Sequence, residues 1–174
     1  AMNQINNQSL AGGLYRSAPI ILLFISVLNE FDFNNLEFKY FSFNFSYILI
    51  FYFSLKRNES LGYTYVFIAG LFNDVVMGTP IGISSFSYLL LCGAAAYLRN
   101  ITLRPSLIKD WVFFLLTILV VNSFYFILLN FFFNHETNFL NQLFNILFTF
   151  LLYFFFSYLF TFFDKTILGS YNVR

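Results

Sequence analysis

The most informative part of the sequence is Phe67-Ile-Ala-Gly-Leu-Phe-Asn-Asp-Val-Val-Met-Gly-Thr-Pro-Ile-Gly-Ile-Ser-Ser-Phe86. It is apolar enough to lie in a lipid bilayer, yet it places an asparagine and an aspartate side by side. A carboxylate inside a membrane segment costs free energy and indicates a functional site by default. The apolar pattern breaks at a Gly-Thr-Pro triplet and then resumes, which predicts a tight hairpin between two helices. The residues expected to shape this hairpin are Gly70, Gly78, Pro80 and Gly82.

The composition of the whole chain agrees with a membrane location. Of its 174 residues, 59% are hydrophobic and only 10% are charged, whereas a soluble globular domain is about a quarter charged. The apolar residues exceed what a soluble core could bury, so the bilayer must act as the solvent. A net charge of +1 leaves no basic patch for nucleic acid. The single cysteine, Cys92, excludes an internal disulfide and a cysteine metal site.

Apolar runs separate at charged or turn-forming clusters, and each run predicts a helix. Because a spanning helix needs about 20 residues, the last two runs are long enough, while the first three are marginal and are expected to be tilted or partly sunk into a bundle. We therefore predict an all-α integral membrane protein with one domain, residues 1–174, folded as a six-helix transmembrane bundle. The predicted helices are 18–33, 40–55, 61–76, 81–98, 111–133 and 139–163.

The basic residues predict how this bundle is oriented. Cytoplasmic loops carry an excess of lysine and arginine, and here the basic residues gather at alternate connections, with only Lys39 on the opposite side. Both termini are therefore expected in the cytoplasm. The residues that carry this argument are Arg16, Lys56, Arg57, Arg99, Arg104, Lys109, Lys165 and Arg174.

Polar side chains are predicted to gather in the outer half of the bundle. Five of the six predicted helices bring such residues there, while the inner halves are almost purely apolar. If these helix faces converge, they enclose a polar cleft that is open to the outside. The candidate partner- or ligand-binding residues are Asn73, Asp74, Ser84, Ser85, Asn122, Asn141 and Asn145.

A structural interpretation competes with this functional one. Asn, Ser and Gln often join membrane helices by hydrogen bonds worth about 0.6 kcal/mol each. Asp74 could accept hydrogen bonds from the following turn and simply fix the hairpin. Asp110 and Asp164, near the predicted cytoplasmic ends, are expected to be screened by water, so that Asp74 is the aspartate with the largest effect when it is replaced.

The sequence gives no support for an enzyme. His135 is the only histidine and lies in a predicted loop. No Ser-His-Asp set, metal-ligand cluster or Gly-rich phosphate loop is present. We therefore predict no catalytic residues, no metal and no cofactor.

The segment from Gly70 to Gly82 resembles the signature of MreD, a family of rod shape-determining membrane proteins. That family usually shows Gly-Leu-x-x-Asp followed by Gly-x-x-x-Gly at this place in a chain of similar length. Here the two parts are Gly-Leu-Phe-Asn-Asp and Gly-Thr-Pro-Ile-Gly. Asn73 departs from the apolar residue that the family usually has beside the aspartate.

The resemblance implies a non-enzymatic member of the bacterial cell-elongation machinery in the plasma (inner) membrane, where it supports peptidoglycan synthesis. The implied partners are MreC first, then MreB, RodA and a class B penicillin-binding protein, together with membrane lipid. The fold of the family is similar to that of the substrate-binding subunits of energy-coupling-factor vitamin transporters. Two hypotheses follow: a scaffold that receives MreC, or a small-molecule-binding subunit of such a transporter.

Overall fold

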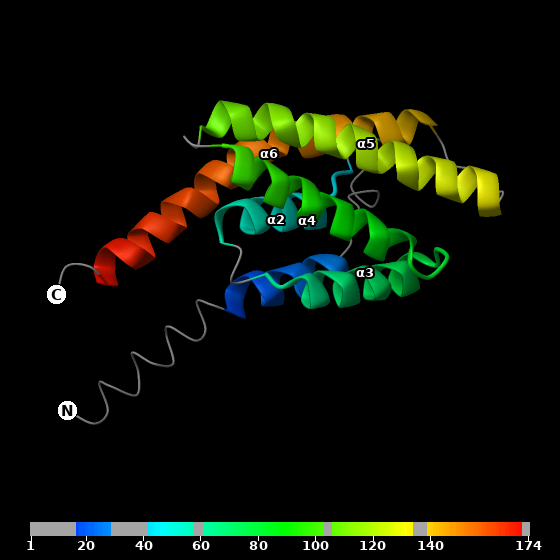
Figure 1. The fold of residues 1–174 in the computed structure, drawn as a ribbon. Coiled ribbons are helices and arrows are strands. Elements are labelled where there is room, and N and C mark those ends of the chain that lie inside the picture. The colour runs from blue at the N-terminus through cyan, green and yellow to red at the C-terminus, as the bar shows by residue number, and fades with distance from the viewer. Residues whose placement is uncertain (1–16, 29–41, 58–60, 103–105, 134–138, 172–174) are drawn as a thin grey trace, which may run out of the picture.

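The structure, a computed structural model, describes residues 17–28, 42–57, 61–102, 106–133 and 139–171 (Figure 1). Within these ranges the chain forms six helices, as predicted. A first helix, Ser17–Leu28, precedes the five labelled ones. Those five are α2 (Phe45–Lys56), α3 (Tyr63–Met77), α4 (Ile83–Ile101), α5 (Leu107–Phe133) and α6 (Phe139–Tyr171).

Several helix ends differ from the predicted ones, which followed hydropathy alone. α2 begins at Phe45 rather than at 40, since Asn44 caps it: the Asn44 side chain accepts a hydrogen bond from the backbone N–H of Tyr47 at 3.2 Å. α5 begins at Leu107 rather than at 111. α6 continues to Tyr171, beyond the predicted end at 163, because an aspartate and a lysine end an apolar run without ending a helix. The predicted end of the first helix, residues 29–33, lies outside the described residues.

The helices form three tiers, with α5 and α6 on one side, α2 and α4 in the middle, and α3 with the first helix on the other side (Figure 1). The α3–α4 turn lies at one end of this bundle, here called the hairpin end. The last residues of α2 and the first turn of α5 lie at the opposite end.

The short helix α2 forms the centre of the core. Every residue from Ser46 to Leu55 is buried. Phe51 contacts Phe114 of α5 and Tyr153 of α6, with ring centroids 5.0 and 5.7 Å away, and those two rings stack on each other at 4.2 Å. Twelve residues make about 18 Å of helix, well short of the about 30 Å of a bilayer core. α2 is therefore too short to cross a bilayer by itself, and other helices enclose it from Ser46 to Leu55.

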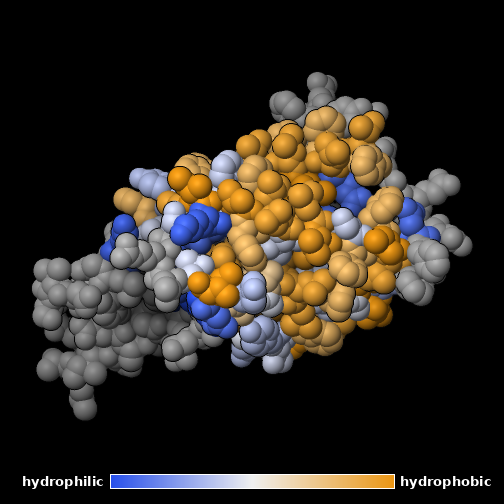
Figure 2. Space-filling model, turned by 45° about the horizontal axis from the view of Figure 1, so that its top comes forward, coloured by the Kyte–Doolittle hydropathy of each residue, from blue (hydrophilic) through white to orange (hydrophobic). Residues whose placement is uncertain are grey.

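Two helices are long and apolar enough to cross a membrane, judged by length and composition: the segments Leu107–Asn130 of α5 and Phe139–Lys165 of α6. Many large apolar side chains are exposed, among them Leu116 and Val120 on α5 and Phe155 on α6. Figure 2 shows hydrophobic residues covering the middle of one face, with hydrophilic residues toward its two ends. Such an exterior fits a membrane protein, and the number of spans stays a prediction.

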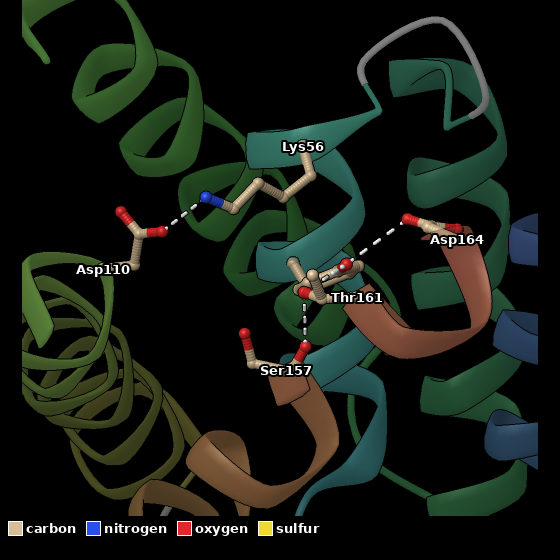
Figure 3. A network of polar contacts seen from close by, with 6 residues as sticks. Lys56, Asp110, Ser157, Thr161 and Asp164 are labelled. Atoms are coloured by element: carbon tan, nitrogen blue, oxygen red, sulfur yellow. Dashed lines mark hydrogen bonds and ion pairs between the residues drawn. The ribbon is translucent and has the colours of Figure 1, made fainter. Parts of the chain in front are cut away.

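Ion pairs tie the helices together at the end opposite the hairpin, and Figure 3 shows the pair of Lys56 and Asp110. Lys56 Nζ of α2 lies 2.7 Å from Asp110 Oδ2 of α5, and the Asp110 side chain is only 2% exposed. Arg57 Nη1 lies 3.6 Å from Asp164 Oδ1 of α6. Asp164 Oδ2 also accepts a hydrogen bond from the Tyr52 hydroxyl at 3.3 Å. The expectation that water screens Asp110 and Asp164 is therefore wrong for Asp110, which is a buried structural group.

Replacing Lys56 is expected to destabilise the fold more than replacing Asp110. Lys56→Ala leaves a buried carboxylate without its ion-pair partner, whereas Asp110→Ala leaves a lysine whose side chain is 28% exposed and can reach water. We expect Lys56→Ala to cost about 2 kcal/mol, less than the value for a fully buried pair. The double variant Lys56→Ala/Asp110→Ala should recover part of this loss. Thermal unfolding in detergent measures the order, and a larger effect of Asp110→Ala alone would contradict it.

Candidate functional site

The α3–α4 turn is built from glycines that adopt left-handed backbone conformations. Gly78 ends α3 with φ +65°, and Gly82 precedes α4 with φ +107°. Residues that carry a Cβ atom rarely adopt these positive φ angles. Gly82 has no side chain that could cap α4, so the first N–H groups of that helix need a partner from elsewhere.

Asp74 supplies that partner. Its carboxylate is fully buried and accepts hydrogen bonds from Thr79 Oγ1 at 3.0 Å, from the Gly82 N–H at 2.7 Å and from the Ser84 N–H at 2.9 Å. A negative charge at a helix N-terminus is also favoured by the helix dipole. Asp74 thus acts as the cap of α4 although it belongs to α3. These contacts match the structural alternative for Asp74, in which the carboxylate fixes the hairpin.

The two helices of the hairpin approach each other most closely at Gly70. A Cβ atom on Gly70 would lie 2.3 Å from Ser85 Cα and 2.6 Å from the Ser85 nitrogen, so only glycine fits. Ser85 is fully buried, and its hydroxyl donates a hydrogen bond to the Phe67 carbonyl oxygen at 3.0 Å. Gly70 and Ser85 therefore serve helix packing.

A polar cavity of about 270 Å³ lies beside the hairpin, among α2, α3, α4, α5 and α6. It gathers five of the seven candidate binding residues, which the sequence placed on four different predicted helices. The other two, Asp74 and Ser85, do not line it. The lining residues are Ser42, Asn44, Tyr47, Asn73, Met77, Ser84, Tyr88, Asn122, Tyr125, Phe126, Asn141, Gln142 and Asn145.

Several of these polar groups also hold helices together. Asn73 Nδ2 donates to Ser84 Oγ at 3.0 Å, which joins α3 to α4. Asn145 Nδ2 of α6 donates to Ser42 Oγ at 3.1 Å, next to the start of α2. Asn122 Nδ2 donates to the Ile118 carbonyl of its own helix at 2.9 Å. The cavity wall is thus a hydrogen-bonded and largely pre-arranged surface.

The sequence analysis missed the aromatic part of this wall, and it placed Gln142 at the right depth without including it among the candidate binding residues. Tyr47, Tyr88 and Tyr125 come from three helices and line the cavity. Helical spacing could have identified Tyr88 as a wall residue, because Tyr88 follows Ser84 by four residues and so shares its helix face. Gln142 is next to Asn141 in the sequence, and depth alone placed it at the same level.

The chemistry of the cavity is that of uncharged hydrogen bonding. None of its described lining residues is Asp, Glu, Lys, Arg or His. Within the described ranges, no three His, Cys, Asp or Glu side chains come close enough to hold a metal ion. The wall offers amides and hydroxyls, which suit binding better than acid–base catalysis.

The fold and its exterior define an all-helical protein of membrane type. Comparison with known proteins names the family: the sequence model of "rod shape-determining protein MreD" matches residues 14–163. Because this match covers most of the chain, the protein belongs to the MreD family, and the resemblance seen at Gly70–Gly82 is confirmed. No curated protein and no solved structure matches the chain. The family has a role in determining rod shape and is a structural family, not a known enzyme family.

Proposed function

We propose that this protein is a non-enzymatic scaffold of the bacterial cell-elongation complex, which binds MreC and supports peptidoglycan synthesis. Membership of the MreD family supports a role in cell shape. The observation that carries the scaffold proposal is that the residues of the family motif stabilise the fold. Asp74 and Gly70 both build the rigid α3–α4 hairpin and are fully occupied by that task. A motif that stabilises shape is what a binding platform needs.

The proposed arrangement is a single domain of six spans in the plasma membrane, with both termini in the cytoplasm and the hairpin end outside. The ion pairs of Lys56 and Arg57 lie at the proposed cytoplasmic end, where charged groups remain close to water. The short helix α2 is compatible with this arrangement because neighbouring helices bury it. The first helix, Ser17–Leu28, buries Leu23 and Val27 in the core and leaves Ile21 and Ile25 exposed on its other face.

The proposed partners are membrane proteins: MreC first, followed by RodA and a class B penicillin-binding protein, with MreB on the cytoplasmic side. Helix association in lipid depends on packing and hydrogen bonds. The MreC helix that docks here should therefore carry small or polar residues near its outer end. Exposed apolar side chains of α3, such as Phe72 and Val75, are available for such packing.

Co-expression with MreC tests this function. A partner that binds the folded state stabilises it by mass action. We expect MreC to co-purify with the protein from membranes and to raise its melting temperature in detergent by several degrees. A soluble MreC fragment that lacks its membrane helix is the control. An unchanged melting temperature and no co-purification would overturn the scaffold proposal.

The second candidate function is a substrate-binding subunit of a vitamin transporter. The amides and hydroxyls that line the polar cavity at the hairpin end favour it. The cavity volume of about 270 Å³ lies just below the about 300–1,000 Å³ of small-molecule pockets, so the ligand would be small. Tight uptake of a water-soluble vitamin by the purified protein, without any effect of MreC, would support this candidate instead.

The proposed topology predicts which single cysteines react with a membrane-impermeant thiol reagent in intact cells. Leu36→Cys and Glu136→Cys should be labelled, because both positions belong to proposed outer connections. Asn58→Cys and Ser106→Cys should be labelled only after the membrane is permeabilised. The native Cys92 is buried and gives little background. The reverse labelling pattern would show that the protein has the opposite orientation in the membrane.

A further inference from the structure

A second cavity lies next to the polar one, between α5 and α6. Its volume is about 440 Å³, and most of its wall is hydrocarbon. Asn122, Phe126 and Gln142 line both cavities, so the two share a wall. The other residues that line the second cavity are Leu119, Ser123, Ile127, Phe139, Leu143 and Ile146.

The apolar cavity opens to the lipid-facing exterior. Ile127 of α5 is 55% exposed, and Phe139 and Leu143 of α6 are 64% and 48% exposed. In a bilayer, a hydrocarbon chain can therefore enter this cavity sideways between the two helices. The polar cavity continues from it toward the hairpin.

Gln142 marks the junction of the two cavities. Its Oε1 atom is buried and accepts no hydrogen bond from any residue that the structure describes. A buried acceptor without a donor costs about 1–3 kcal/mol, and such groups in native proteins call for an explanation. Because Gln142 lines both cavities, a rotation of its amide would bring this oxygen to a bound molecule that presents a hydroxyl or N–H group.

The bound group must be uncharged. None of the described residues that line either cavity carries a formal charge. A phosphate or ammonium group placed here would lose its water without gaining an ionic partner, which is strongly unfavourable. Amide and hydroxyl groups suit a neutral head that both donates and accepts hydrogen bonds.

We propose that the cleft between α5 and α6 binds a membrane amphiphile with an uncharged, hydroxyl-bearing head. The head lies in the polar cavity and donates a hydrogen bond to Gln142, while the hydrocarbon chain fills the apolar cavity. This inference requires that the protein lies in a membrane, but it does not require that MreC binds. The MreC experiment and the lipid experiment can therefore fail independently.

Photolabelling in nanodiscs tests the proposal with two lipid probes that carry a diazirine on the acyl chain. One probe is diacylglycerol, which has a neutral head with a hydroxyl; the other is phosphatidylglycerol, which is anionic. We expect diacylglycerol to label residues 119–127 and 139–146 several times more strongly than phosphatidylglycerol does. Equal labelling by both probes, or labelling spread evenly over the exterior, would mean ordinary bulk lipid and would overturn the proposal. This comparison uses the unaltered protein.

Variants of α6 locate the site. Gln142→Leu removes the acceptor and should reduce diacylglycerol labelling about fivefold, as expected for one lost hydrogen bond. Leu143→Trp should fill the apolar cavity and abolish the preference between the probes. Leu151→Trp is the matched control, since Leu151 is also a half-exposed leucine of α6, at 50% against 48% for Leu143, but lines neither cavity. An equal loss in all three variants would contradict the assignment.

Discussion

Gly70→Ala should prevent the α3–α4 hairpin from closing and sharply reduce the amount of folded protein. The added methyl group would lie 2.3 Å from a backbone atom of Ser85, which cannot move aside as a side chain could. Ordinary overpacking costs about 1–3 kcal/mol, and a clash between two backbones should reach or exceed the top of that range. The measurement is the melting temperature and the yield of monodisperse protein in detergent.

Gly93→Ala is the matched control. Gly93 also lies within a helix, α4, but nothing lies within 4 Å of the position its Cβ would take. Because alanine favours a helix by about 1 kcal/mol over glycine, this variant should be as stable as the parent or slightly more so. If the two variants have the same melting temperature, the close approach at Gly70 is not what holds the hairpin together.

Asp74→Ala should have the second large effect. It removes three hydrogen bonds at once, leaves the N–H groups of Gly82 and Ser84 and the Thr79 hydroxyl without their acceptor, and uncaps α4. One unsatisfied buried group costs about 1–3 kcal/mol, so the total loss should exceed that of a single bond. Melting temperature and protein level in membranes are the readouts.

Two further substitutions separate the causes of the Asp74 effect. Asp74→Asn keeps the size but turns one acceptor oxygen into an NH₂ donor that faces another donor, so it should rescue only part of the stability. Asn73→Ala loses the single hydrogen bond to Ser84 and should cost about 1 kcal/mol. If Asp74→Ala proves no more harmful than Asn73→Ala, the carboxylate does not cap α4.

The hairpin could be predicted from the sequence because its signals are local. Gly78, Pro80 and Gly82 lie within five residues of one another and separate two apolar runs. A helical chain must turn there. The polar cavity could be predicted in part, because membrane depth orders residues along one axis. Depth brought Asn73, Asn122 and Asn145 to one level but could not say which of them face inward or that tyrosines complete the wall.

The parts that the sequence could not predict depend on contacts between distant segments. The buried Asp110 pairs with Lys56, which is 54 residues away in the sequence. From the sequence alone, an aspartate near a helix end is expected to be solvated. The burial of α2 on all sides likewise follows from its neighbours, since an apolar run looks the same whether protein or lipid surrounds it. The role of Asp74 stayed open because acceptor chemistry alone fits both a cap and a ligand site.

The enclosure of α2 has a consequence for how the chain is made. The rings that pack on Phe51 belong to α5 and α6, and the arginine that bonds the Ser54 carbonyl belongs to α4. All of these partners leave the ribosome after α2 does. A helix of about 18 Å cannot match the bilayer by itself, so α2 reaches its final place only when the later helices are inserted. The final packing of this segment, which is synthesised early, therefore waits for the last helices of the chain.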